Sequence, residues 1–144
     1  MWLGVSSGSK TYVKLNGEKQ TMGNTCWFTN IDHGRRHQPL QLMTMSDNIK
    51  YSKHKEVKDI GYVKYDNYDA LEVPFSDAIP SDYTEPMGVP ISFMSKFCPE
   101  QFEIIDGIGR YSVLDNERTK KEGKYLSMVD GQPKFFRIII RKKQ

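Results

Sequence analysis

Apolar residues occur along this chain in short runs separated by polar stretches, a pattern that favours β-strands over long helices. The most apolar run covers residues 135–140 (FFRIII) and predicts a strand at the centre of a sheet. A hairpin-type turn is predicted at Asn16-Gly17. Shorter runs predict further strands at residues 2–5, 12–15, 25–30, 70–74 and 102–105.

Helical spacing is confined to two short segments. Ser46 is a residue type that caps helices, and it predicts a short helix over residues 47–52. Pro90 suits a first helical turn, and the apolar residues after it recur at helical spacing. A second helix is therefore predicted over residues 91–97, ending before Pro99.

The remaining stretches are predicted to be loops. Residues 32–39 are polar and basic, and residues 40–45 fit either an extended segment or one turn. Residues 53–69 are charged and aromatic, which predicts another loop, and the prolines between 74 and 90 exclude a long element. Residues 108–131 are rich in glycine and charge and predict a long mobile excursion.

Together these elements predict one domain over residues 1–144, of the β-rich α/β class or the α+β class. The composition, 38% hydrophobic and 27% charged residues, is that of a soluble globular protein. No apolar run approaches the roughly 18 residues of a membrane span, and the first residues lack the pattern of a signal peptide. They read instead like a strand interrupted within a larger domain.

Two cysteines, Cys26 and Cys98, each lie in an apolar context. This usage indicates free thiols and a reducing, cytoplasmic location. A disulfide between them stays open as the alternative, because spacing alone does not establish proximity.

The charge is unevenly distributed, although the net charge is only +3. Residues 31–64 carry +3 and residues 107–144 carry +6, whereas residues 65–106 carry −8. Clustered positive charge is typical of nucleic-acid-binding proteins. A solvated surface with interspersed ion pairs is the alternative. The acidic stretch is expected to pack internally or to face the basic tail.

Five blocks follow one another in an order that resembles the C-terminal portion of the EcoRI-type adenine-specific DNA methyltransferases. The blocks are TCWFTNID (25–32), DHGRRHQPL (32–40), YDNYDALEV (65–73), MGVPISFMSKFCPEQFEI (87–104) and FFRIIIRKK (135–143). The resemblance implies a bacterial or phage origin and the later strands of a Rossmann-like class I methyltransferase sheet, with target-recognition loops. It also implies that the full-length enzyme transfers a methyl group from S-adenosylmethionine to adenine N6 in double-stranded DNA.

The catalytic machinery of such an enzyme is missing from the sequence. The family holds the flipped adenine with an (Asp/Asn)-Pro-Pro-aromatic motif, and the chain contains no Pro-Pro pair. The cofactor needs a glycine loop followed by a helix and an acidic strand end. Residues 105–109 (IDGIG) have the glycines but not that context. We therefore assign no catalytic and no cofactor-binding residue, and we expect S-adenosylmethionine to bind only the full-length enzyme.

Two further motifs are set aside. Residues 4–8 (GVSSG) match the nucleophile-elbow pattern, but no helix follows and the histidines come too early for a hydrolase. His33 and His37 have the spacing of two metal ligands on a helix, but Gly34 and Pro39 disfavour a helix there. We assign no metal site.

The basic region at residues 32–64 is the best candidate for DNA contact. Arg35 and Arg36 present guanidinium groups that suit phosphate or guanine. The alternative is a solvated loop in which one of them pairs with an acid of residues 65–106. The predicted DNA-binding residues are His33, Arg35, Arg36, Lys50, Lys53, Lys55 and Lys58.

The sequence thus predicts the DNA-engaging portion of an adenine methyltransferase, inactive by itself. A non-catalytic DNA-binding or protein-interaction module is the alternative. The expected partners are double-stranded DNA and the missing N-terminal half of the methyltransferase. A truncated sheet also has an unpaired edge, so self-association through that edge is expected.

Overall fold

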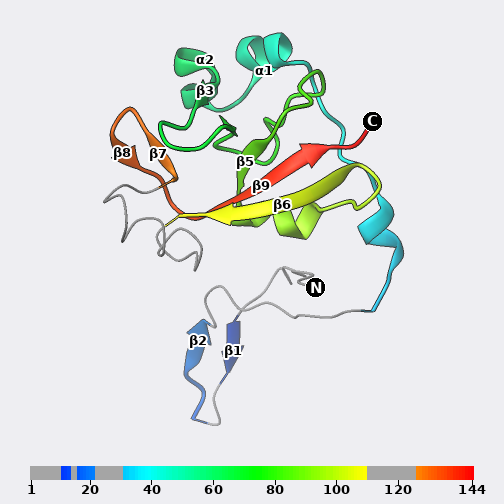
Figure 1. The fold of residues 1–144 in the computed structure, drawn as a ribbon. Coiled ribbons are helices and arrows are strands. Elements are labelled where there is room, and N and C mark those ends of the chain that lie inside the picture. Colours follow the sequence, from blue (N-terminus) through cyan, green and yellow to red (C-terminus); the bar gives the residue numbers. More distant parts are fainter. Residues whose placement is uncertain (1–10, 14–15, 22–30, 110–125) are drawn as a thin grey trace.

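The computed structural model describes residues 11–13, 16–21, 31–109 and 126–144. Their central feature is a mixed five-stranded sheet with the strand order β3-β4-β5-β9-β6 (Figure 1). Strands β4 and β5 are parallel, and every other neighbouring pair in this sheet is antiparallel. The strands are β3 (Val63–Lys64), β4 (Leu71–Glu72), β5 (Met87–Pro90), β6 (Phe102–Ile108) and β9 (Arg137–Lys142).

Strand β9 organises the core because both of its faces are buried. Ile138 and Ile140 pack into one cluster with Phe93 and Phe102. Ile139 faces the other way and packs into a second cluster, which includes Ile108. This two-sided burial explains why the strand is apolar without alternation, as in the interior strands of covered sheets.

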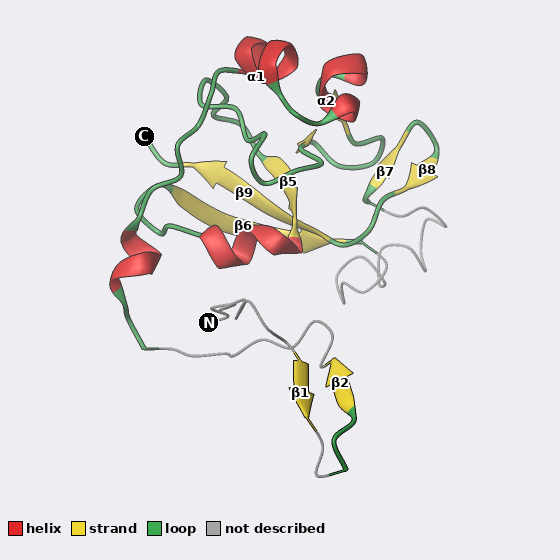
Figure 2. Ribbon diagram, turned by 180° about the vertical axis from the view of Figure 1, so that it is seen from behind, coloured by secondary structure: helices red, strands yellow, loops and turns green. Residues whose placement is uncertain are grey.

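The described residues form four short helices beside the sheet. Helices α1 (Met45–Tyr51) and α2 (Lys55–Ile60) pack against each other, and the 3₁₀ helix η1 (Gly34–His37) precedes them. The 3₁₀ helix η2 (Ile91–Lys96) follows β5 and crosses in front of β6 and β9 in Figure 2. Its Phe93 is fully buried and meets the ring of Phe102 edge-on, at a centroid distance of 5.4 Å. No helix of the described residues has the length and apolarity needed to cross a membrane.

Two hairpins complete the described part of the chain. Strands β1 (Thr11–Val13) and β2 (Lys19–Thr21) pair antiparallel, and the turn between them contains Gly17 at φ 79°. Strands β7 (Met128–Val129) and β8 (Gln132–Pro133) pair in the same way. The first hairpin confirms the turn predicted at Asn16-Gly17.

Most of the predicted elements within the described residues are confirmed, as is the β-rich α/β class. The apolar run at 135–140 corresponds to β9, and the run at 102–105 forms the first half of β6. The helix predicted at 47–52 exists as α1, but it begins earlier. Its N-cap is Thr44, whose Oγ1 accepts a hydrogen bond of 3.1 Å from the Asp47 amide.

Other predictions are wrong. Residues 53–69 are not a continuous loop, because they contain α2 and β3; only Val57 of α2 is buried, so no apolar stripe marks this helix. Residues 32–39 include the 3₁₀ helix η1. The proline-rich stretch between residues 74 and 90 has no long element, as predicted, but it does contain the four-residue strand β5, which tolerates Pro90 as its last residue. The helix predicted at 91–97 is a 3₁₀ helix.

The strands predicted at residues 2–5 and 25–30 lie outside the described residues, as do Cys26 and the 4–8 motif. Of the predicted excursion at 108–131, residues 110–125 lie outside as well, whereas its last residues include β7.

Candidate nucleic-acid interface

The 3₁₀ helix η1 presents the first group of predicted DNA-binding residues. Glycine and basic residues form its single turn, which the Arg36 amide closes by donating to the His33 carbonyl at 3.0 Å. Arg35 is exposed, and Arg36 is half-buried. The buried Nε of Arg36 has no hydrogen-bond partner in the described part of the chain. We call His33, Arg35, Arg36 and His37 the η1 surface.

His37 fixes the end of this surface. Its Nε2 lies 2.7 Å from Oδ1 of Asp32, and its Nδ1 lies 2.5 Å from Oε1 of Glu100. A carboxylate only accepts, so both ring nitrogens must donate, which requires the charged imidazolium. The hydrogen bonds that His37 donates to Asp32 and to Glu100 accordingly raise the pKa of His37. The pKa of Asp32 is lowered in turn, mainly by its hydrogen bond with His37.

A turn at residues 98–101 anchors the η1 surface to the sheet. Besides Glu100, this turn supplies Gln101, whose side chain accepts from the Leu40 amide at 2.7 Å and donates to the Leu40 carbonyl at 2.8 Å. Sγ of Cys98 donates to Oε2 of Glu100 at 3.2 Å, and this bond is the main cause that lowers the pKa of Glu100. Cys98 is therefore a buried, reduced thiol with a local partner.

The second group of predicted residues lies on the helix pair. Lys53 forms an ion pair of 2.7 Å with Asp77, so part of its charge is neutralised. Lys50 lies over the ring of Tyr51, 4.9 Å from its centroid. Lys55 and Lys58 are exposed on α2, and among the described residues neither has a carboxylate within 4.0 Å.

The structure does not bring these two groups together. Figure 1 shows α1 and α2 at one end of the sheet and η1 well below them, beside the start of β6. The same separation is visible from behind in Figure 2. Two basic surfaces therefore exist, the η1 surface and a helix-pair surface made of Lys50, Lys53, Lys55 and Lys58.

The acidic stretch and the basic tail face each other, as expected. Arg137 of β9 binds Glu72 of β4 at 2.7 Å, and Arg141 binds Glu103 of β6 at 2.5 Å. The alternative that Arg35 or Arg36 pairs with an acid is not seen, since no carboxylate of the described residues lies within ion-pair distance of either.

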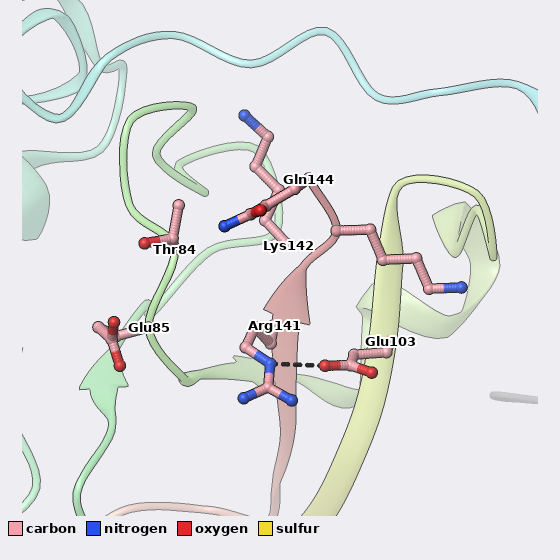
Figure 3. Close-up of a pocket in the computed structure, with 7 residues that line it drawn as sticks. Thr84, Glu85, Glu103, Arg141, Lys142 and Gln144 are labelled. Carbon is pink, nitrogen blue, oxygen red and sulfur yellow. Dashed lines mark hydrogen bonds and ion pairs between the residues drawn. The ribbon is translucent and has the colours of Figure 1, made fainter.

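The last two lysines have different partners from the arginines of β9. Lys142 Nζ donates to the Ser81 carbonyl at 2.5 Å, and Lys143 Nζ donates to the Pro99 carbonyl at 2.7 Å. They line an open pocket of about 560 Å³ at the end of β9, in which Arg141 turns toward Glu103 (Figure 3). The pocket is lined by Thr84, Glu85, Glu103, Arg141, Lys142, Lys143 and Gln144. The sequence identifies this tail as basic, but it does not indicate that the two lysines bind backbone carbonyls and not carboxylates.

The two glycines of the 105–109 motif have a packing role. They lie at the end of β6, where a Cβ on Gly107 would come within 2.8 Å of the Phe136 ring. A Cβ on Gly109 would come within 2.7 Å of the Phe136 backbone, and Gly109 has φ 127°. These glycines therefore make room for Phe136.

At the His33–His37 pair, one of the two histidines already has a partner on both ring nitrogens. His37 uses both ring nitrogens as donors to carboxylates, which leaves it no lone pair for a metal ion. Within residues 11–13, 16–21, 31–109 and 126–144, no group of three or more His, Cys, Asp or Glu side chains is arranged to hold a metal ion.

Comparison with known proteins identifies relatives along nearly the whole chain. Residues 5–143 match the family model described as adenine-specific methyltransferase EcoRI. The type II methyltransferase M.EcoRI of Escherichia coli is 38% identical over 138 residues, which cover 95% of this chain and 36% of that relative. The type II methyltransferase M.MpnI of Mycoplasma pneumoniae is 33% identical over 142 residues, covering 94% and 42%. No solved structure matches the chain.

Proposed function

Because the chain belongs to the family of adenine-specific methyltransferases typified by EcoRI, we propose that it forms the DNA-engaging, C-terminal portion of a DNA N6-adenine methyltransferase. The chain spans between 36% and 42% of the length of the relatives described above. The complete enzyme transfers the methyl group of S-adenosylmethionine to adenine in duplex DNA. We also propose that the strands of this chain form the later part of its Rossmann-like sheet, in which β4 and β5 would be a parallel pair.

The observation that carries the proposal is the uncompensated charge of the η1 surface. Arg35 and Arg36 have no carboxylate partner among the described residues, and His37 neutralises part of the charge on Asp32 and Glu100 beside them. Guanidinium groups free of carboxylates are suited to backbone phosphates. The lysines of the helix-pair surface add a second region of phosphate contact, with Lys53 contributing less because it binds Asp77.

The experiment is a salt titration of DNA binding by the 144-residue chain. Each phosphate contact contributes about −0.9 to the slope of log K against log[salt] on duplex DNA. We expect the R35Q/R36Q double variant to reduce the magnitude of that slope by roughly 2. The matched control is K64Q, because Lys64 is paired with Asp69 at 2.8 Å. An affinity that does not depend on salt would contradict phosphate contact.

The missing Pro-Pro motif and glycine loop support a division of labour. We propose that the catalytic residues and the cofactor site belong to the rest of the enzyme, so this chain alone neither methylates DNA nor binds S-adenosylmethionine tightly. Isothermal titration with S-adenosylmethionine tests this point. Micromolar binding by the isolated chain would contradict it.

A protein-interaction role is the second candidate, and β6 supports it. This strand is an edge of the sheet, and Ile104 and Ile105 on it are each 43% exposed. An edge with exposed apolar side chains favours pairing with another strand. We propose that the N-terminal half of the enzyme covers this edge, and that the isolated chain self-associates there. Sedimentation of the I105K variant tests this: it should be monomeric at concentrations where the unmodified chain associates, and equal association of both would contradict it.

A further inference from the structure

The two lysines at the end of β9 hold backbone carbonyls, although two acids lie near them in the same pocket. Lys142 Nζ binds the Ser81 carbonyl at 2.5 Å and Lys143 Nζ binds the Pro99 carbonyl at 2.7 Å. An ammonium group has three donors, and a neutral carbonyl occupies only one of them. Within the described part of the chain, each lysine therefore keeps its full charge and two free donors, in a position fixed by the hydrogen bond.

The arginines of the same strand have the opposite arrangement. Arg137 and Arg141 each bind a carboxylate, Glu72 and Glu103 respectively, which neutralises their charge. Positive charge that is still available to a ligand is therefore confined to the end of the strand. In the pocket there, Glu103 is neutralised by Arg141, and Glu85 is the one acid that has no ion-pair partner among the described residues.

The end of β9 and the η1 surface are anchored to the same turn. The amide of Lys143 donates to the Gln101 carbonyl at 2.9 Å. The side chain of Gln101 holds Leu40 with two hydrogen bonds, and the neighbouring Glu100 holds His37. Segments more than a hundred residues apart in sequence are thus fixed on the turn 98–101. They lie on the same side of the sheet, at the start of β6 (Figure 1).

We propose that Lys142 and Lys143 are additional phosphate-contacting residues, and that they extend the DNA-binding η1 surface across the turn 98–101 to the end of β9. This inference rests on the proposed DNA binding and names a part of it that neither family membership nor the basic region at 32–64 assigns. The ligand is the DNA backbone. An ammonium group with free donors binds a phosphate oxygen as a point charge, so the contact is independent of base sequence.

The test uses five variants of the full chain in the salt titration of duplex binding. K142Q and K143Q should each reduce the magnitude of the salt slope by about 1, whereas K142R and K143R should keep it. E85Q removes the negative charge of the acid that has no ion-pair partner in the pocket, so it should tighten DNA binding. If the lysines had only a structural role, E85Q would not tighten binding. Because Lys142 is partly buried, thermal unfolding of each variant confirms that it is folded; the exposed Lys143 carries the test if K142Q unfolds.

The outcomes separate the two proposals. If R35Q/R36Q reduces the slope but K143Q does not, the tail makes no phosphate contact and this inference is overturned, while DNA binding by the η1 surface stands. If binding by the unmodified chain is independent of salt, the proposed function fails as well. If the magnitude of the salt slope falls equally in K143Q and K143R, the shape of the lysine side chain and not its charge affects binding, which would also overturn the inference.

Discussion

Glu72 and Arg137 form a buried ion pair that crosses an intervening strand. Nη2 of Arg137 lies 2.7 Å from Oε1 of Glu72, and the two side chains are 11% and 3% exposed. Glu72 belongs to β4 and Arg137 to β9, yet β5 lies between these strands in the sheet. The hydroxyl of Tyr65 also donates to Glu72, so three side chains share one buried site.

Loss of Arg137 is expected to destabilise the fold strongly. Burial alone would lower the pKa of Arg137, but the hydrogen bonds and charge of Glu72 raise it, so the guanidinium is charged. The R137M variant leaves Glu72 buried without its counter-charge, which should reduce the free energy of unfolding by about 3–5 kcal/mol in urea titrations. R141M removes an exposed pair and should cost at most about 1 kcal/mol. Equal losses for both variants would contradict a special role for burial.

The ion pair requires a glycine in the strand that it crosses. A Cβ on Gly88 of β5 would lie 2.7 Å from Cζ of Tyr65, closer than side chains approach one another. G88A should therefore push Tyr65 from its place and reduce the free energy of unfolding by about 1–3 kcal/mol. Gly34 is the control because nothing lies within 4 Å of its added Cβ. If G34A destabilises the fold as much as G88A does, the loss comes from backbone entropy and not from a clash with Tyr65.

Protonation of His37 should be measurable and should depend on Glu100. The hydrogen bonds with Asp32 and Glu100 raise the pKa of His37 above 6.5. A raised folded-state pKa means that the stabilisation from the imidazolium is fully present below about pH 6.5 and disappears as the pH rises through the folded-state pKa. An NMR titration of the imidazole should give the higher pKa, and E100Q should lower it. A His37 pKa at or below 6.5 in the unmodified chain would contradict the paired geometry.

Helix α1 offers a direct comparison of two cap residues. Thr44 accepts from the Asp47 amide, whereas the Ser46 hydroxyl, among the described residues, bonds only to the Thr44 hydroxyl, at 3.1 Å. T44A should reduce the free energy of unfolding by about 1 kcal/mol, and S46A should change it much less. Thermal or urea unfolding of the two variants checks this. The reverse order would restore the cap at Ser46 that the sequence alone predicts.

The elements that the sequence predicts well are those whose signal is local. Strand β9 is apolar at consecutive positions because Ile138, Ile139 and Ile140 bury both faces of the sheet. The sequence does not reveal strand β5, because only three residues, Met87 to Val89, lie between Pro86 and Pro90. The sequence does not reveal helix α2, because Val57 is its only buried residue and no apolar stripe at helical spacing marks it.

The candidate site is harder to predict because its organisation is not local. The basic residues of η1 are visible in the sequence, but the turn that anchors them is not. Nothing in the sequence distinguishes Gln101 from other polar residues, because its partners Leu40 and Lys143 are brought beside it only by the fold. Which lysines keep their charge also depends on long-range partners, as the contrast between Lys53 and Lys55 shows.

The place of β9 in the sheet has a consequence for how the protein is made. Its two neighbours, β5 and β6, are both synthesised before it, and β9 must enter between them. Until residues 137–142 have been synthesised, β5 and β6 lack the strand that joins them, and their apolar side chains lack the contacts with Ile138, Ile139 and Ile140. The five-stranded sheet therefore closes only after β9 has been made, and until then the incomplete sheet exposes apolar surface and unpaired strand edges.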